Sequence, residues 1–329
     1  MKDDGKSIII ITHKLHEVLE ISDRVVVLRK GKYIGDVPTS ETDALKLTEM
    51  MVGRAVSLDI ERSEPVDPKP RLIVNGLTVC DADGVKRLDD VSFTAYSGEI
   101  LGVAGISGSG QKELLESIAG LQCCQDCSSI KFLPGEGDPE ELSGMHPLDI
   151  KNLGVALAFV PEDRLGMGLV GSMNLIDNMM LRSYSNGSGP FADRKKPKKL
   201  AETVVDELEV VTPNLNTAVR KLSGGNVQKV LVGREISMEP QLLMSAYAVR
   251  GLDINTSYNI YHLLSEQKKR GAAVIFVGED LDVLLELCDR IMVLCGGKVS
   301  GIVDGRNTTK EAVGLMMTHL GEGTQDHEE

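Results

Sequence analysis

Residues 98–120 read GEILGVAGISGSGQKELLESIAG, and the rest of the chain is organised around them. The short apolar run Ile100–Ala104 predicts a buried strand, which glycines at positions 105, 108 and 110 follow. Apolar residues then recur at helical spacing, at Leu114, Leu115, Ile118 and Leu121. A glycine loop between a strand and a helix lets backbone N–H groups converge on one anion at the positive end of the helix. The stretch therefore predicts a cradle for a phosphate group.

The charge of this cradle departs from the usual phosphate-loop pattern, G-x-x-x-x-G-K-[ST]. The glycine spacing fits from Gly105 to Gly110, but Gln111 stands where the pattern has lysine, and Lys112 where it has serine or threonine. The loop alone therefore leaves nucleotide binding open. The candidate binding residues in it are Gly105, Ser107, Gly108, Ser109, Gly110, Gln111 and Lys112.

The composition is that of an acidic chain with reduced thiols. With 329 residues, of which 42% are apolar, we expect a sizeable core and one large domain or one and a fraction. The net charge of -13 opposes binding to nucleic acids or anionic membranes over most of the surface. We expect neither a leader peptide nor a membrane-spanning segment. Cys124 and Cys127 lack the second pair that a structural zinc site needs, so we expect incidental thiols and no metal site.

An internal repeat indicates how the chain is divided. Residues 8–32 return 266 positions later as residues 274–298, so that His13 falls on Glu279. The shared order is a strand, a helix and a strand, which predicts a strand at residues 8–11. The chain is therefore expected to hold two copies of the end of one domain.

The two copies differ in what precedes them, because the phosphate loop lies before the second copy alone. We expect residues 1–60 to be the C-terminal remnant of a first domain and residues 61–70 to be a stiff exposed linker. Residues 71–320 are then a complete second domain, and residues 321–329 a disordered tail. Either the chain is a fragment of a longer two-domain protein or its gene start has been lost, and the sequence leaves both open.

The second domain alternates between strand and helix patterns. Short alternating strands near residues 72–74 and 91–95 predict a small antiparallel sheet, and residues 174–211 follow a helical pattern. Continuous apolar runs predict further buried strands of a parallel sheet, covered by helices on both faces, at residues 155–160, 242–244 and 274–277.

The most specific string in the chain is Leu222-Ser223-Gly224-Gly225-Asn226-Val227-Gln228-Lys229. Ser223 and two glycines expose free N–H groups at the start of a helix. The buried stripe predicted for that helix is Val227, Val230, Leu231 and Ile236. Here the chain resembles ATP-binding cassette (ABC) subunits, whose signature is LSGGQ, and in particular the two-cassette subunits of sugar and nucleoside importers. Val227 departs from that group's LSGGNQQKV string.

This resemblance covers nearly all of the chain and implies an α/β fold of the P-loop NTPase class. It implies a parallel core sheet flanked by helices, a small antiparallel β subdomain and a helical subdomain. Residues 161–164, PEDR, place Glu162 where other cassettes have a metal-contacting glutamine. Residues 250–253 resemble the D-loop, with Asp253 at its end, and His13 matches the switch histidine of a first cassette. The implied cofactors are ATP and Mg²⁺, bound weakly here or held with a partner cassette.

Four residues on which hydrolysis depends in the family are replaced at the matching positions. Gln111 replaces the phosphate-binding lysine, Ala246 the metal-binding aspartate, Tyr247 the catalytic glutamate and Glu279 the switch histidine. Losing one charge-assisted contact costs about 1.5–3 kcal/mol, so weak nucleotide binding by the backbone of residues 105–112 is expected and turnover is not. The resemblance implies no intact catalytic residue and no metal ligand in the second cassette.

In the family, two cassettes face head to tail, and the signature of one closes over the phosphate loop of the other. Ser223, Gly224 and Gly225 would then serve the site of another cassette. The implied partners are that cassette, integral-membrane permease subunits and, indirectly, an extracytoplasmic solute-binding protein; nucleic acid is not expected. The implied location is cytoplasmic, peripheral on the inner face of the cell membrane. The basic run at residues 194–199 is interpreted as a solvated loop or, alternatively, as a contact with the permease or lipid headgroups.

These observations favour a truncated nucleotide-binding subunit of a sugar or nucleoside importer. Such a subunit couples ATP binding and hydrolysis to solute uptake. We expect the ATP site of this chain itself to be impaired in hydrolysis. Two alternatives remain open: a non-catalytic nucleotide-binding or regulatory module, and a non-functional gene remnant.

Overall fold

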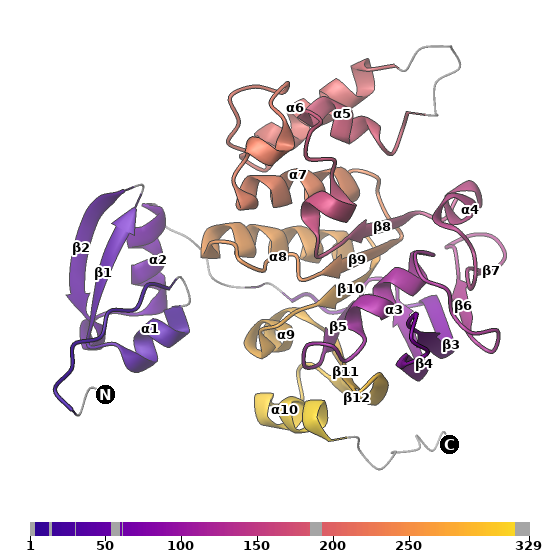
Figure 1. Cartoon of the computed structure of the whole chain (residues 1–329), viewed down its shortest axis with the longest axis horizontal. Helices are drawn as coiled ribbons and strands as arrows, with labels where there is room; N and C mark the ends of the chain where they lie inside the picture. The colour runs from indigo at the N-terminus through magenta and orange to yellow at the C-terminus, as the bar shows by residue number, and fades with distance from the viewer. Residues whose placement is uncertain are drawn as a thin grey trace. The chain divides into compact units, whose positions relative to one another are not determined.

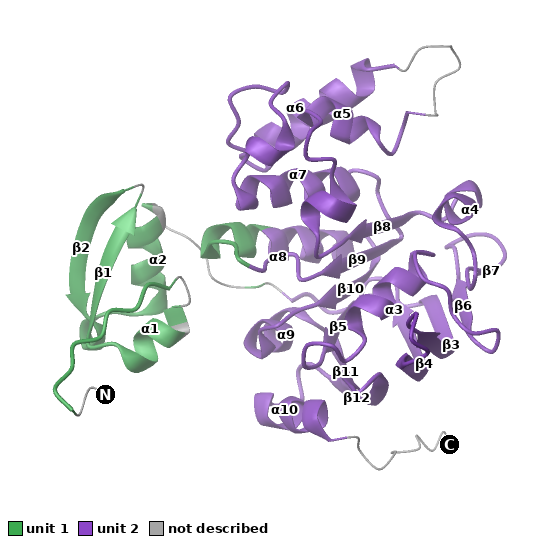
Figure 2. Ribbon diagram, in the orientation of Figure 1, with its two compact units in different colours: residues 1–60, 251–259 green, residues 61–250, 260–329 purple. Residues whose placement is uncertain are grey.

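The computed structural model in Figure 1 describes residues 4–12, 15–29, 31–53, 60, 62–184 and 193–319. Two compact units make up the chain, one from residues 1–60 and 251–259 and the other from residues 61–250 and 260–329 (Figure 2). His13 and the segment 321–329 lie outside the described residues.

Residues 15–53 of the first unit form a β-hairpin with two helices. The elements are α1 (Leu15–Ile21), β1 (Arg24–Arg29), β2 (Lys32–Pro38), the 3-10 turn η1 (Thr39–Glu41) and α2 (Ala44–Val52). Asp43 begins α2 because its side chain accepts a hydrogen bond from the backbone N–H of Lys46 at 2.8 Å. Val27 and Leu47, 3% and 0% exposed, bury the apolar side of the hairpin against this helix.

The helices and strands of this set return in the second unit, each 266 positions later. They are α9 (Leu281–Leu287), β11 (Arg290–Cys295), β12 (Lys298–Asp304) and α10 (Lys310–Thr318). Both hairpins are antiparallel, and both shift register at the same place, after Val27 in one and after Val293 in the other. The predicted repeat is therefore present in the structure, down to the residues at which its elements begin and end.

The first strand of the repeat is an exception, and the prediction of a strand at residues 8–11 is wrong. These four isoleucines form no strand, and their exposed fractions range from 54% to 97%. Their counterparts belong to β10 (Ala273–Val277), which pairs with a strand on each side. In the described part of the first unit, β1 and β2 pair with each other, so residues 8–11 lack the ladder partners on which a strand depends.

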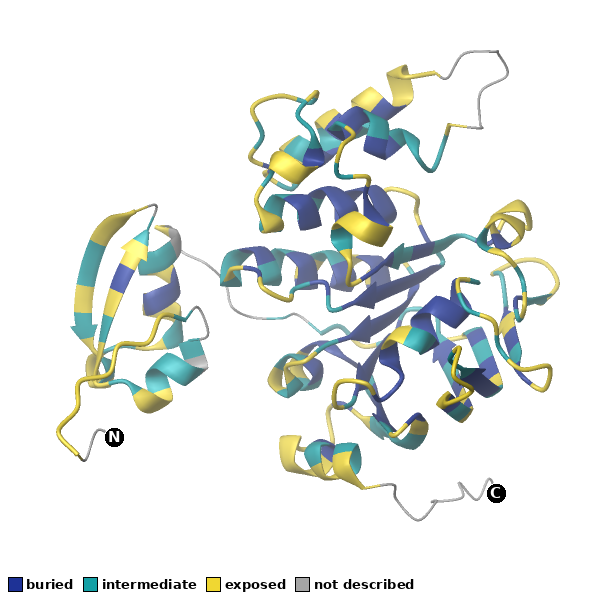
Figure 3. Cartoon of the chain, in the orientation of Figure 1, coloured by how far each residue is buried: buried dark blue, intermediate teal, exposed yellow. Residues whose placement is uncertain are grey.

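The main sheet of the second unit has six strands in the order β12, β11, β5, β10, β9, β8. The remaining bounds are β5 (Ile100–Ala104), β9 (Leu242–Ala246) and β8 (Leu157–Val160). All neighbours are parallel except β11 and β12. Every residue of β5, β9 and β10 is buried, as Figure 3 shows by colour, because the sheet is covered on both faces.

An antiparallel sheet of four strands packs beside this main sheet, with the order β4, β3, β6, β7. Its strands are β3 (Pro70–Cys80), β4 (Lys86–Tyr96), β6 (Ser129–Phe132) and β7 (Glu140–Glu141). One cluster of buried side chains joins the two sheets and α3 (Gln111–Ile118), and includes Leu72, Leu114, Phe132, Met244 and Ile275. The predicted α/β fold with a parallel core sheet and a small antiparallel sheet is confirmed.

Helices complete the second unit. They are α4 (Pro147–Asn152), the π turn η2 (Arg164–Gly168), α5 (Leu175–Met180), α6 (Lys195–Glu207), the 3-10 turn η3 (Val219–Lys221), α7 (Gly224–Ile236) and, from residue 260 on, α8 (Ile254–Lys269). Asn178 binds the segment before α5 to that helix, since its side-chain amide contacts both the N–H and the C=O of Val170, at 2.8 and 3.1 Å. In the described part of the chain, no helix is long and apolar enough to cross a bilayer.

Three local expectations from the sequence are corrected by the structure. Leu121 lies beyond the end of α3 and is 48% exposed, because the chain turns at Gly120, whose φ is +73°. Ile236, in the last turn of α7, is half-buried rather than part of the buried stripe. The basic run at residues 194–199 is not a loop, since α6 begins at Lys195 and buries Pro197 in its first turn.

Glu99, which directly precedes β5, is a buried carboxylic acid with a shifted pKa. It is 5% exposed and accepts a hydrogen bond from Arg290 Nη1 at 3.1 Å. Burial, partly offset by the arginine, raises its pKa from 4.5 to about 7. This pKa is higher in the folded protein than in the unfolded chain, so the protonated Glu99 side chain contributes to the free energy of unfolding. That contribution is fully present below about pH 4.5 and is lost as the pH rises through about 7.

Replacing Glu99 by glutamine is expected to remove this pH dependence. Between about pH 4.5 and 7.5, the wild-type protein should lose at most about 3 kcal/mol of unfolding free energy relative to Glu99→Gln. Urea unfolding of both proteins at several pH values measures the difference. Stability curves that stay parallel over this range would contradict the raised pKa.

Candidate functional site

A cavity of about 380 Å³ lies where the strands of the main sheet end. The carboxyl ends of parallel strands share one edge of a sheet, which is where α/β folds bind ligands. The cavity is formed by residues that follow β5, β8, β9 and β10. Its walls are Gln111, Lys112, Leu115, Glu116, Phe159, Pro161, Glu162, Asp163, Met167, Ala246, Tyr247 and Val277.

The glycine loop between β5 and α3 has the backbone of a phosphate cradle. A Cβ at Gly105 would lie 2.7 Å from the carbonyl oxygen of Leu294, and one at Gly110 would lie 2.8 Å from that of Arg87. Gly110 and Gly108 also have φ values of +103° and +86°, which favour glycine. No side chain caps the N-terminus of α3, so its first N–H groups are available to an anion.

The first side chain of α3 gives this cradle no positive charge. Gln111 is 3% exposed and bends back onto the loop, where its Nε2 donates to the carbonyl of Ile106 at 3.2 Å. The ammonium of the next residue, Lys112, lies 3.8 Å from the carboxylate of Glu116. The donors that this loop could offer a phosphate are therefore backbone amides, and the side chain of Gln111 adds no charge to them.

An arginine stands between two carboxylates at the strand ends. Arg250 Nη1 pairs with Glu162 after β8, and Arg250 Nε pairs with Glu279 after β10 at 3.1 Å. The guanidinium carbon also lies 6.0 Å from the ring centroid of Tyr247. The arginine neutralises one of the two acids, and the group as a whole keeps one negative charge. We call these residues, Glu162, Arg250 and Glu279, the arginine clamp.

Tyr247 directly follows β9 and lies beside the arginine clamp. Its φ is +49°, in the left-handed region, and its N–H donates to the carbonyl of Val277 at 3.0 Å. Burial, followed by the nearby charges of Glu162 and Glu279, raises the pKa of the phenol, so the side chain stays neutral. A neutral phenol cannot accept a proton as the carboxylate of the glutamate expected at this position would.

The glycine loop suits the phosphates of a nucleotide, whereas the two positions expected to bind Mg²⁺ do not suit that ion. Backbone N–H groups and glycines without clashing Cβ atoms suit an anion. Mg²⁺ prefers carboxylate and hydroxyl oxygens, and Ala246 and Lys112 offer neither at the positions expected to supply them. Among the described residues, no group of three or more histidine, cysteine, aspartate or glutamate side chains is arranged to hold a metal ion.

The glycine signature lies at the start of α7. Ser223 is the N-cap of this helix, and its hydroxyl accepts a hydrogen bond from Asn226 Nδ2 at 2.8 Å. Gly224, the first residue of the helix, packs closely against Arg164. A Cβ at this position would lie 3.3 Å from Arg164 Nη1. Within the described part of the chain, Ser223, Gly224 and Gly225 are not among the residues that line the cavity.

The structure thus brings some predicted site residues together. Gln111, Lys112, Glu162, Ala246 and Tyr247 line one cavity, and Glu279 joins them through the arginine clamp. Asp253 caps α8 instead, where its carboxylate accepts from the N–H and the hydroxyl of Thr256 at 3.0 and 2.8 Å.

Sequence reasoning missed the role of Arg250, although it quoted the residue. Its two ion pairs join strand ends that lie 88 and 29 residues away along the chain. Asp163, Phe159 and Met167 also line the cavity. The sequence signal for them was their place in or near the PEDR stretch, whose first three residues belong to the cavity wall.

Comparison with known proteins identifies this arrangement. Residues 88–245 match the family described as ABC transporter. This chain carries an ABC transporter cassette. The match includes the glycine loop, β8 and the signature, and ends in β9. The family expected from the signature is thereby confirmed.

Curated relatives of the cassette are import proteins. The glucose import ATP-binding protein TsgD13 of Haloferax volcanii is 36% identical over 98% of this chain and 58% of its own length. The nucleoside import ATP-binding protein NupA of Lactococcus lactis subsp. cremoris is 35% identical over 95% of this chain and 61% of its own length. The guanosine import ATP-binding protein NupO of Bacillus subtilis is 36% identical over the same shares. The chain therefore spans about three fifths of these relatives.

Solved structures show the same fold. A dimeric post-hydrolysis state of an ATP-binding cassette bound to ADP and Pi matches with a TM-score of 0.62 and 21% identity, over 72% of this chain and all of that one. A nucleotide-free cassette from an ABC transporter matches with a TM-score of 0.59 and 19% identity, over 76% of this chain and 95% of that one.

Proposed function

We propose that this chain is a nucleotide-binding part of an ATP-driven importer of sugars or nucleosides. Its second cassette binds nucleotide weakly through the glycine loop and does not hydrolyse it. Support for the importer comes from relatives at 35–36% identity that are named for glucose, nucleoside and guanosine import.

The observation that carries the loss of hydrolysis is the chemistry of the cavity. Gln111, Ala246 and Tyr247 line it at the positions where the resemblance expects a lysine, an aspartate and a glutamate, and Glu279 stands at that of the histidine. Phosphoryl transfer relies on positive charge around the transferred group and on a base that orients the water. The arginine clamp instead brings two carboxylates to this edge.

Residues 1–60 are proposed to be the C-terminal part of another cassette. Support comes from the four elements whose bounds repeat 266 positions apart, including the shared register shift of the two hairpins. In this interpretation, His13 is the switch histidine of that cassette.

The signature is proposed to complete the site of a partner cassette in a head-to-tail dimer. Support comes from Ser223 and Gly225, which present a helix N-terminus away from this chain's own cavity lining. The further proposed partners are permease subunits and, through them, a solute-binding protein, at the inner face of the membrane. Mg²⁺ would act at the partner's phosphate loop.

Purified alone, the chain is expected to release phosphate from Mg-ATP no faster than the buffer blank, because its cavity lacks a catalytic base and metal ligands. Co-purified with a cassette that has an intact phosphate loop, it should support turnover that Ser223→Ala lowers by about tenfold or more. A phosphate-release assay measures both. Ser237→Ala, at the other end of α7, is the matched control and should leave turnover unchanged.

Rapid turnover by the isolated chain that disappears in Ser223→Ala would refute the proposed loss of hydrolysis. Turnover by the pair that is indifferent to Ser223 would refute the proposed role of the signature.

The loss of all four catalytic positions also favours a second candidate, a regulatory nucleotide-binding module that works without transport. Co-purification with permease subunits separates the two, since the importer subunit requires that complex and the module does not.

A further inference from the structure

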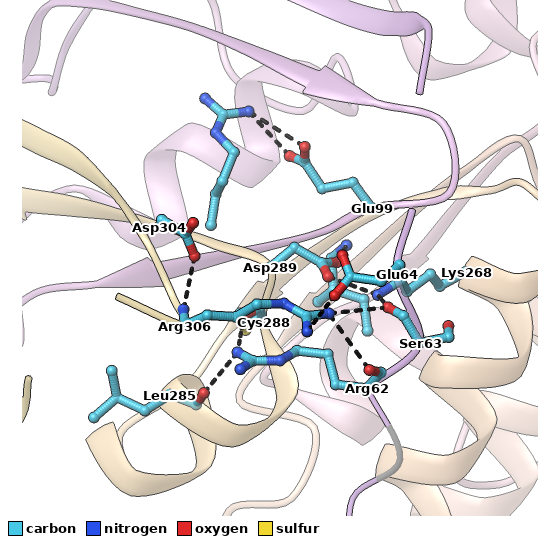
Figure 4. A network of polar contacts seen from close by, with 12 residues as sticks. Arg62, Ser63, Glu64, Glu99, Lys268, Leu285, Cys288, Asp289, Asp304 and Arg306 are labelled. Atoms are coloured by element: carbon cyan, nitrogen blue, oxygen red, sulfur yellow. Dashed lines mark hydrogen bonds and ion pairs between the residues drawn. The ribbon is translucent and has the colours of Figure 1, made fainter. Parts of the chain in front are cut away.

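Residues 62–64, which lead from the first unit into the second, lie in a polar network on the second unit (Figure 4). Arg62 Nη1 donates hydrogen bonds to the carbonyls of Leu285 at 2.8 Å and Cys288 at 2.7 Å. Both carbonyls lie at the C-terminal end of α9, where helices leave acceptors unsatisfied and carry partial negative charge. The guanidinium thus supplies the two donors and the positive charge that this helix end calls for.

A buried lysine binds the next residue of the segment. Lys268 is 2% exposed, and its ammonium donates to the carbonyl of Ser63 at 2.5 Å and to Asp289 Oδ1 at 2.7 Å. The other oxygen of Asp289 accepts from the N–H of Ile100 at 2.8 Å, where β5 begins. A buried charge is costly unless each of its donors finds a partner. The segment therefore completes a continuous chain of hydrogen bonds that runs from Ser63 to β5.

An arginine closes the network from the other side. Arg306 Nη1 pairs with Glu64 at 2.5 Å, and its Nη2 donates to the carbonyl of Ser63 at 3.4 Å. Residue 305, directly before Arg306, is glycine, which lets the backbone lie close to the carbonyl of Cys288 and to the side chain of Arg62. A Cβ at Gly305 would lie 2.3 Å from the carbonyl oxygen of Cys288 and 3.3 Å from Arg62 Nη1.

We propose that residues 62–64 are a strap, which fastens the connection from the first unit to α9 and β5 of the second. These elements continue toward the candidate site, since β5 leads into the glycine loop and α9 begins two residues after Glu279 of the arginine clamp. The strap holds the end of α9 through Arg62 and the start of β5 through Lys268 and Asp289. Releasing it loosens these two ends, while the centre of the sheet stays intact.

The strap is tested by two variants that remove different contacts. In Arg62→Ala, amide hydrogen exchange at Leu287 and Cys288, at the end of α9 that Arg62 holds, should be about tenfold faster than in the wild type, with exchange in β9 unchanged. In Arg306→Ala, which keeps the tryptic site, cleavage between Arg62 and Ser63 should be about tenfold faster. Both measurements use the full chain: mass spectrometry of its peptides after exchange locates the first effect, and mass spectrometry of the tryptic fragments follows the second.

Lys69→Ala is the matched control, because Lys69 lies in the same connection and forms an exposed ion pair with Asp67. This variant should match the wild type in both measurements. The strap is overturned if Arg306→Ala is cleaved no faster than Lys69→Ala, or if Arg62→Ala leaves exchange at Leu287 and Cys288 unchanged. Neither readout depends on nucleotide binding, so the proposed function stands or falls separately.

Discussion

Replacing Glu235 by alanine is expected to lower the free energy of unfolding of the second unit by about 3–5 kcal/mol, because it leaves a buried arginine without its partner. Glu235 is 1% exposed, on α7 behind the signature. Its carboxylate accepts from Arg182 Nη2 at 2.7 Å, from Arg234 Nε at 2.9 Å and from the N–H of Phe159 at 3.2 Å. It thereby joins α7, β8 and the residues that follow α5.

The size of this effect comes from what remains after the substitution. The Arg234 side chain is 7% exposed, and its Nη2 also donates to the carbonyl of Gly168 at 2.7 Å, a neutral group that does not balance the buried charge once Glu235 is removed. Removing one member of a buried ion pair costs far more than removing an exposed pair, which contributes about 0–1 kcal/mol. Urea unfolding followed by circular dichroism measures the loss.

Glu202→Ala is the control for this measurement. Glu202 is half exposed on α6 and lies 3.8 Å from Lys198, so its loss should change stability by less than about 1 kcal/mol. Equal effects of the two substitutions would show that Glu235 does not bridge these elements.

The strands and the glycine loop could be predicted from the sequence because their signals are local. Apolar runs of strand length coincide with β5, β9 and β10, and the order of glycines and helix marks the cradle. The signature predicts α7, which begins directly after Ser223. These features depend on residues that are close together in the chain.

The features that sequence reasoning missed depend on partners far away in the chain. Arg62 is bound by carbonyls more than 220 residues away, and Arg250 by a carboxylate 88 residues away. Neither pairing leaves a periodic pattern. Residues 8–11 show that a local signal can also mislead. The same kind of apolar run forms β10 in one copy of the repeat and no strand in the other. A strand requires neighbouring strands, which its own sequence does not encode.

Restoring the missing lysine is expected to strengthen nucleotide binding without restoring turnover. In Gln111→Lys, the affinity for ATP should rise about tenfold to a hundredfold, because an ammonium next to the phosphates adds one charge-assisted contact. Residue 111 is well placed for this, as the first residue of α3 and part of the cavity wall. Titration with a fluorescent ATP analogue measures the change.

Hydrolysis should remain at the level of the buffer blank in Gln111→Lys, since Ala246, Tyr247 and Glu279 still offer neither a metal ligand nor a base at the strand ends. Gln125→Lys is the matched control: it adds the same charge at an exposed residue that, in the described part of the chain, is not among those that line the cavity, so it should change the affinity by less than about threefold. An unchanged affinity in Gln111→Lys would mean that phosphate does not bind at this loop. A gain in turnover would mean that the lysine was the one missing catalytic group, and that the arginine clamp does not block the chemistry.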